Sequence, residues 1–182
     1  MTYKSYQPQQ NHHHMKATTY FFKDDGKIPN SQLPLILYKG VFFENNDADA
    51  MIAHFRDFKW HNAWKNGVYD FHHYHSTTHE VLGVYQGNAM LQFGGEMGEK
   101  VQVEEGDVVI IPAGVGHKRI SQSDDFAVVG AYPDGCDFDI MKGELGERPA
   151  ADANILKVAL PENDPVFGKA DGLLIIWKHE FA

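Results

Sequence analysis

Residues 71–80 of the chain read FHHYHSTTHE, with four histidines and one glutamate in ten positions. In an extended strand successive side chains point to opposite faces, so His73 and His75 would share one face. A carboxylate follows after a short turn at Glu80, and a further imidazole stands downstream at His117. Together these four side chains would supply a divalent metal ion with nitrogen and oxygen donors. The sequence therefore predicts a metal centre on a β scaffold.

The same histidines allow other interpretations. His75 and His79 are four residues apart, and on a helix they would face the same side as zinc ligands. The flanking residues are β-branched or aromatic, which favours a strand, and the order of His and Glu fits neither zinc-protease helix. The histidines could also pack or face solvent without a metal. Strand alternation turns His72 away from the proposed centre. We expect His79 to face solvent, with a hydrogen bond behind the ligands as the alternative.

The spacing of these residues resembles that of the cupin family. The first cupin motif places Gly, His-x-His, Glu and Gly at set intervals, and the second places Gly, Pro-x-Gly, His and Asn. The chain matches nine of these ten positions, at Gly67, His73, His75, Glu80, Gly87, Gly106, Pro112, Gly114 and His117. Ser121 stands at the tenth, where the family has Asn. This difference affects a secondary polar contact and none of the metal ligands.

The resemblance implies an all-β fold, a cupin-type jelly-roll barrel with the metal inside it. We expect one domain with a barrel core at about residues 35–132, an N-terminal extension at 1–34 and a C-terminal extension at 133–182. The run VVGAYP at 128–133 adds a resemblance to uncharacterised bacterial single-domain cupins. The resemblance assigns the four ligands to one divalent transition metal ion, such as iron, manganese, nickel or zinc.

Short apolar runs alternate with turn residues along the chain, as in a sandwich or barrel. A helix capped by Asn45 or Asn46 should run to about Phe58 and pack outside the barrel. The segment 153–160 reads as a short helix or strand. Strands are expected near residues 18–22, 35–43, 68–75, 80–86, 88–94, 100–103, 107–111, 117–121, 126–132 and 173–177.

Composition restricts the class of protein. With 182 residues, 43% of them hydrophobic, the chain can bury a core without disulfide bonds. Its formal net charge of −9 argues against nucleic-acid binding, which needs clustered cations. The sequence has neither a membrane-spanning apolar run nor the apolar core of a signal peptide. With the single cysteine, Cys136, this predicts a cytoplasmic protein. We expect the polar tail at 1–17, including His12 to His14, to bind metal loosely at best.

Strand alternation also nominates substrate-binding residues. Tyr69 and Phe71 would share the face of His73, and Arg119 would share the face of His117. A cavity lined in this way suits a small organic acid that chelates the metal while Arg119 holds its carboxylate. The alternatives are an ion pair of Arg119 with Asp124 or Asp125, and plain barrel packing of the two aromatic residues.

Two hypotheses of function follow. The first is a metal-dependent enzyme, of oxygenase or isomerase type, that acts on a small organic acid or a sugar-like molecule. The second is a non-catalytic barrel that binds a small ligand as a sensor or carrier; the fold alone does not separate the two. We also expect a homodimer, because an open sheet edge and long extensions need covering.

Overall fold

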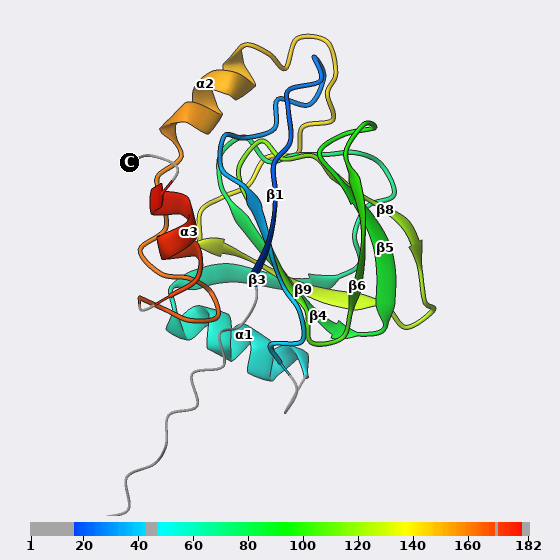
Figure 1. Ribbon diagram of the computed structural model, residues 1–182, viewed down its shortest axis with the longest axis vertical. Coiled ribbons are helices and arrows are strands. Elements are labelled where there is room, and N and C mark those ends of the chain that lie inside the picture. Colours follow the sequence, from blue (N-terminus) through cyan, green and yellow to red (C-terminus); the bar gives the residue numbers. More distant parts are fainter. Residues whose placement is uncertain (1–16, 43–46, 170, 180–182) are drawn as a thin grey trace, which may run out of the picture.

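The computed structural model describes residues 17–42, 47–169 and 171–179. Expectations that concern the tail before residue 17, or capping by Asn45 or Asn46, lie outside the described residues. Two antiparallel sheets face each other around a core, which confirms the predicted all-β jelly-roll fold (Figure 1).

The larger sheet has six strands, in the order β1 (Ala17–Tyr20), β2 (Leu35–Tyr38), β7 (Val108–Ile111), β4 (Glu80–Gln86), β9 (Ala127–Pro133) and β3 (Trp60–Asn66). The smaller sheet has three strands, in the order β6 (Glu99–Glu104), β5 (Asn88–Phe93) and β8 (His117–Gln122). The predicted strands at 80–86, 88–94, 100–103, 107–111, 117–121 and 126–132 correspond to β4 through β9. Gly40, with a φ of 58°, lies just beyond β2, which is therefore shorter than predicted.

The larger sheet is covered on both faces, and its sequence reflects this. Its inner face packs against the small sheet through residues such as Leu82, while its outer face lies under helices through residues such as Val81. All four residues of β7 are consequently buried and apolar. In contrast, β6 alternates exposed residues with the buried Val101 and Val103, because its second face meets solvent.

Helix α1 (Ala48–Asp57) covers the outer face of the larger sheet, as predicted. The side chain of Asp47 caps it by accepting the Ala50 N–H at 2.7 Å. Met51 and Phe55 are fully buried against the sheet. A Cβ atom at Gly83 would clash with Met51 and Phe55, so glycine at this position allows the helix to approach β4 closely.

Two predicted strands are wrong. The segment 68–75 bends at Asp70 and Phe71, and it hydrogen bonds first to β8 and then, at Tyr74, to Met141. The strand of this region is β3, whose mostly exposed polar residues hide it from an apolar pattern. The predicted strand 173–177 is part of helix α3 (Leu173–His179), since a short apolar run does not distinguish helix from strand.

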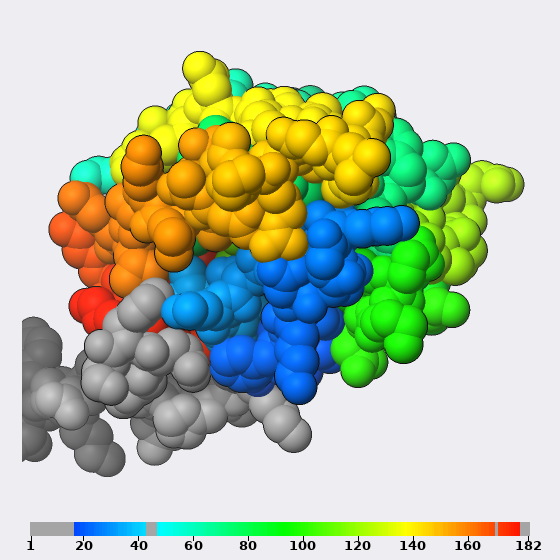
Figure 2. Space-filling model, turned by 90° about the horizontal axis from the view of Figure 1, so that it is seen from above, coloured from blue at the N-terminus to red at the C-terminus, as the bar shows by residue number. Residues whose placement is uncertain are grey.

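The C-terminal extension packs on the barrel. Helix α2 (Ala150–Lys157) lies beside the N-terminal segment (Figure 2). The two are joined by Arg148, whose guanidinium binds both Asp24 and Asp152. Further along, the buried Asp164 accepts hydrogen bonds from the Tyr38 hydroxyl at 2.6 Å and the Leu173 N–H at 2.8 Å. None of the described helices is long and apolar enough to span a membrane.

Candidate metal centre

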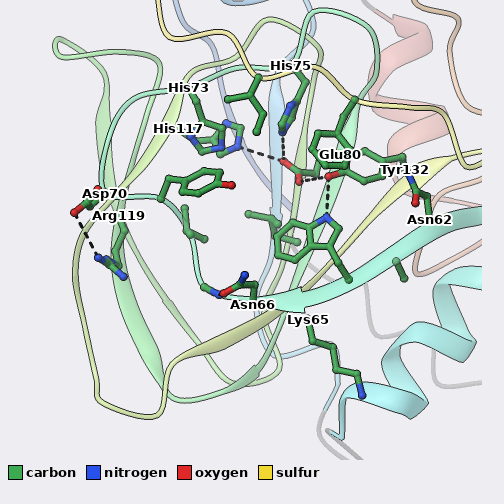
Figure 3. Close-up of a pocket in the computed structure, with 18 residues that line it drawn as sticks. Asn62, Lys65, Asn66, Asp70, His73, His75, Glu80, His117, Arg119 and Tyr132 are labelled. Carbon is green, nitrogen blue, oxygen red and sulfur yellow. Dashed lines mark hydrogen bonds and ion pairs between the residues drawn. The ribbon is translucent and has the colours of Figure 1, made fainter.

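Three imidazoles meet at one end of the barrel (Figure 3). Backbone hydrogen bonds join His73 to His117, the first residue of β8, and so bring two distant segments together. The ring centroids of these residues are 4.0 Å apart, and His75 lies 5.5 Å from His117. One potential ligand atom from each of the three residues lies within 4.8 Å of the others. This group is buried and could hold a metal ion.

Backbone carbonyls define which nitrogen of each imidazole faces the centre. The Nδ1 atoms of His73, His75 and His117 lie 3.2, 2.5 and 3.1 Å from the carbonyl oxygens of Phe71, Asp139 and Val115. A carbonyl only accepts, so each Nδ1 must donate its proton. In a neutral ring, Nε2 then carries a lone pair, as a metal ligand requires.

Glu80 adds a carboxylate to this group. It is the first residue of β4, and its Oε2 lies 3.1 Å from His75 Nε2 and 3.3 Å from His117 Nε2. Neutral rings with their protons on Nδ1 would leave lone pairs facing a carboxylate oxygen. Such an arrangement requires a cation between the groups, either a proton or a metal ion.

Burial and mutual contacts shift the pKa values of these groups. Burial, reinforced by His117 and His75, lowers the pKa of His73 to about 2, so the ring stays neutral. Burial also acts to lower the pKa of His75, but Glu80 outweighs it and the pKa is raised. For Glu80, burial favours the protonated form, yet His75 and His117 outweigh it and hold the pKa well below its usual range. The carboxylate is therefore charged.

Tyr132 and Trp64 orient the other oxygen of Glu80. The Tyr132 hydroxyl donates to Glu80 Oε1 at 3.2 Å and accepts the Trp64 Nε1–H at 2.8 Å. Burial raises the pKa of Tyr132 well above its usual range, so this hydroxyl keeps its proton. A side chain at Gly130 would collide with the Trp64 ring. The glycine thus makes room for an indole that supports Tyr132.

A cavity of about 600 Å³ opens in front of these groups. Its wall contains Arg119, which lies two residues after His117 on β8. The guanidinium donates to Gln122 at 2.8 Å and lies 3.9 Å from Asp70. The ion-pair alternative is thus realised in part, with Asp70 as the partner in place of Asp124 or Asp125. Other lining residues include Asn62, Trp64, Asn66, Val68, Leu82, Tyr132, Phe138 and Ile140.

Of the two predicted aromatic residues, Tyr69 borders this cavity and Phe71 does not. Their rings stack with centroids 4.8 Å apart, and the Tyr69 ring meets the edge of His73 at 5.1 Å. Their exposed fractions are 51% and 37%, so they do not belong to the barrel core. Tyr69 lines the cavity, while Phe71 supports it from behind and lies under the Lys142 ammonium.

The C-terminal extension contributes to this site, although none of its residues was among the predicted site residues. Phe138 and Ile140 line the cavity, and the Phe138 ring stacks on Tyr132 at 4.8 Å. Between them, Asp139 contacts the His75 loop on the other side. The alternation of apolar and acidic residues at 138–140 indicates a segment with one buried face. It does not predict that this segment contacts a loop about 60 residues away in sequence.

The two remaining histidines of the opening stretch lie behind the site. His72 is largely buried, with Nε2 at 3.3 Å from Glu96, which agrees with its predicted turn away from the centre. The expected solvent exposure of His79 is wrong, because the residue is 2% exposed. Its Nδ1 accepts the Ala113 N–H at 2.9 Å and its ring packs on Trp177. Helix α3, absent from the sequence-based prediction, provides this cover.

Comparison with known proteins identifies a relative that matches most of the chain and a family model that matches its middle part. A relative from Bacillus subtilis (strain 168), which carries the name Uncharacterized protein YjlB, is 46% identical over 163 residues. The match covers 89% of this chain and 97% of that protein. The family model described as Cupin domain matches residues 63–130, which include the three imidazoles and Glu80.

Solved structures give weaker matches. Procruciferin, an 11S globulin from Brassica napus, is 19% identical, with 60% of this chain and 27% of that chain covered and a TM-score of 0.37. Oxalate decarboxylase from Bacillus subtilis, described for its Mn(II) centers, is 16% identical, with 60% and 22% covered and a TM-score of 0.33. The chain thus spans about a quarter of the length of these two proteins. From the sequence relatives and the fold together, the chain belongs to the cupin family.

Proposed function

We propose that this cupin is a metal-dependent enzyme, of oxygenase or isomerase type, that acts on a small organic acid or a sugar-like molecule in the cavity of about 600 Å³. His73, His75, Glu80 and His117 would hold one divalent transition metal ion. Bound there, such an ion supplies Lewis-acid or redox chemistry. A non-catalytic ligand-binding barrel is the alternative.

One observation carries the metal proposal. Each of the three Nδ1 atoms faces a backbone carbonyl, so that in neutral rings the Nε2 lone pairs and a charged Glu80 oxygen converge and need a cation between them. A divalent cation at this position would neutralise the carboxylate and use all the lone pairs. Four protein ligands leave open positions on an octahedral ion, and open positions favour catalysis over a purely structural role.

The residues around the ligands would bind and orient the substrate. Arg119 would hold a carboxylate of the substrate, with Asp70 released from its 3.9 Å contact. Tyr69 would provide a flat wall beside His73, and Phe138 would limit water at the opposite wall. Tyr132 would keep Glu80 Oε1 engaged, leaving Oε2 toward the imidazoles.

Metal analysis followed by substrate screening tests the proposal. Protein purified without added metal is analysed for metal content, and the loaded protein is then incubated with a panel of small acids and sugars. Oxygen uptake measures oxygenase activity, and NMR of the mixture detects isomerised product. Turnover that disappears with chelator and returns with metal supports the enzyme. Ligand binding without turnover across the panel favours the sensor or carrier.

Replacement of Arg119 by alanine should weaken binding of acids to the metal-loaded protein without removing the metal. A hydrogen bond to a charged group contributes about 1.5 to 3 kcal/mol, which corresponds to about 10- to 150-fold in the dissociation constant. Competition from Asp70 places the expected loss toward the lower end. Calorimetric titration of the Mn(II)-loaded protein with each acid that binds gives the constants.

Lys118→Ala provides the matched control for Arg119→Ala. Lys118 is the neighbouring cation on β8, and its ammonium pairs with Glu96 at 2.8 Å. Both variants change the net charge of the chain by the same amount. If the two variants bind every acid with equal affinity, a local role of Arg119 in acid binding is refuted.

We further propose that the protein forms a homodimer. β1 lies at one edge of the six-stranded sheet, and Phe21 directly after it is 58% exposed. An exposed strand edge invites pairing with a second chain, and twofold dimers are the commonest assemblies. Multi-angle light scattering at micromolar concentration should give twice the mass of the chain. A monomer mass at that concentration would contradict the proposal.

A further inference from the structure

The loop that carries His75 is held by a segment of the C-terminal extension. Residues 137–141, here called the strap, run beside residues 74–77. The Tyr74 and Met141 backbones exchange two hydrogen bonds of 2.9 Å, and the Thr77 hydroxyl donates to the Asp137 carbonyl at 3.0 Å. The strap therefore lies along this loop and does not merely touch it.

Asp139 makes the central contacts of the strap. Its backbone carbonyl accepts from His75 Nδ1 at 2.5 Å. Its carboxylate accepts the Ser76 N–H at 2.7 Å and also the Ser76 hydroxyl. Asn154 of α2 donates to the same hydroxyl oxygen at 3.1 Å, which ties α2 to the loop. Asp139 thus hydrogen bonds to two consecutive residues of the loop, His75 and Ser76.

The three imidazoles differ in the origin of their support. The carbonyls that hold Nδ1 of His73 and His117 come from residues two positions earlier in sequence. The carbonyl that holds Nδ1 of His75 comes from a residue 64 positions away. His73 and His117 are therefore oriented by their own backbone segments, whereas His75 depends on the packing of the strap.

We propose that Asp139 is a positioning residue for the metal centre, whose carboxylate anchors the strap so that its carbonyl sets the tautomer and orientation of His75. This inference rests on the proposed metal site. Partners behind a metal ligand commonly contribute about 10- to 100-fold to metal affinity. Removal of the carboxylate should free the strap and let the His75 ring turn away.

The test is a titration of the full-length metal-free protein with Mn(II), in which EPR measures the free ion. Asp139→Ala should raise the Mn(II) dissociation constant about 10- to 100-fold. Asp137→Ala is the matched control, because it removes an exposed carboxylate from the same strap and leaves the backbone contact to Thr77. Pulsed EPR should detect weaker or fewer histidine nitrogen couplings in Asp139→Ala than in Asp137→Ala.

A purely structural role would give a different result. In that case the melting temperature of the metal-free Asp139→Ala protein would fall while its Mn(II) constant and nitrogen couplings matched those of Asp137→Ala, and the inference would be overturned. If Asp139→Ala does not fold, the milder variants Asp139→Asn and Ser76→Ala weaken the hydrogen bonds between Asp139 and Ser76. Each should raise the Mn(II) dissociation constant. An unchanged constant in both would equally overturn it. Failure of the wild-type protein to bind any of Mn(II), Fe(II), Ni(II) and Zn(II) would instead refute the metal site itself.

Discussion

Replacement of His117 by alanine is expected to reduce the metal content from about one divalent ion per chain to almost none. The variant removes one of three imidazoles whose ligand atoms lie within 4.8 Å of one another. It also leaves His75 Nε2, at 3.1 Å, as the remaining imidazole nitrogen beside Glu80 Oε2. Fewer ligand atoms then surround the position of the metal ion. Mass-spectrometric metal analysis after dialysis, together with circular dichroism to check folding, measures the effect.

Two controls distinguish metal bound in the cavity from metal bound by histidines elsewhere in the chain. His61→Ala removes an exposed imidazole from β3 and should leave the metal content unchanged. Deletion of residues 1–14 removes the three consecutive histidines of the N-terminal tail and should also leave it unchanged. A folded His117→Ala protein that retained a full equivalent of metal would rule out the proposed ligand set.

The second large effect is a loss of stability at acidic pH through His79. Burial beneath Trp177 lowers the pKa of this ring to about 4, because it disfavours the charged form by more than a backbone hydrogen bond to Ala159 favours it. The unfolded chain binds this proton near pH 6.5 and the folded chain only near pH 4. The stabilisation is therefore complete above pH 6.5 and is lost as the pH falls toward 4. Its full size is about 3 kcal/mol, of which about 2 kcal/mol should be lost between pH 7 and 5.

Urea unfolding of metal-free protein at pH 7 and pH 5 measures this loss. His79→Asn is the comparison, since an amide oxygen can accept the Ala113 N–H but carries no proton to titrate. The variant should be less stable at pH 7, because its smaller side chain leaves space under Trp177. Between pH 7 and 5, however, it should lose about 2 kcal/mol less than the wild type. Equal losses in the two proteins would show that His79 does not titrate as described.

Much of the fold could be predicted because the barrel strands carry strong local patterns. β4 was predicted with its observed bounds, and α1 was predicted to end near Phe58 and to pack outside the barrel. The errors lie where tertiary packing decides the conformation. β3 presents polar side chains at a sheet edge, so its sequence lacks a hydrophobic alternation. The run at 173–177 is helical because Leu173 and Trp177, one helical turn apart, both bury against the barrel.

The candidate site was predictable where its residues are close in sequence or follow a spaced motif. His73, His75, Glu80 and His117 meet in the structure, and Arg119 and Tyr69 line the same cavity. The strap and the Trp64–Tyr132 pair were not predicted, because a single sequence does not reveal which distant segment closes a barrel. Asp70 was likewise not predicted as the ion-pair partner of Arg119. The partners considered were Asp124 and Asp125, which are close to Arg119 in sequence.

Anomalous diffraction from crystals of the full-length protein, recorded at the absorption edge of the metal found by elemental analysis, would locate the metal ion. We predict one strong peak per chain in the cavity, about 2.0 to 2.3 Å from Nε2 of His73, His75 and His117 and from a Glu80 oxygen. A cavity without a peak in protein that contains a full equivalent of metal, or a peak located only at the histidines of residues 12–14, would contradict the proposed metal centre.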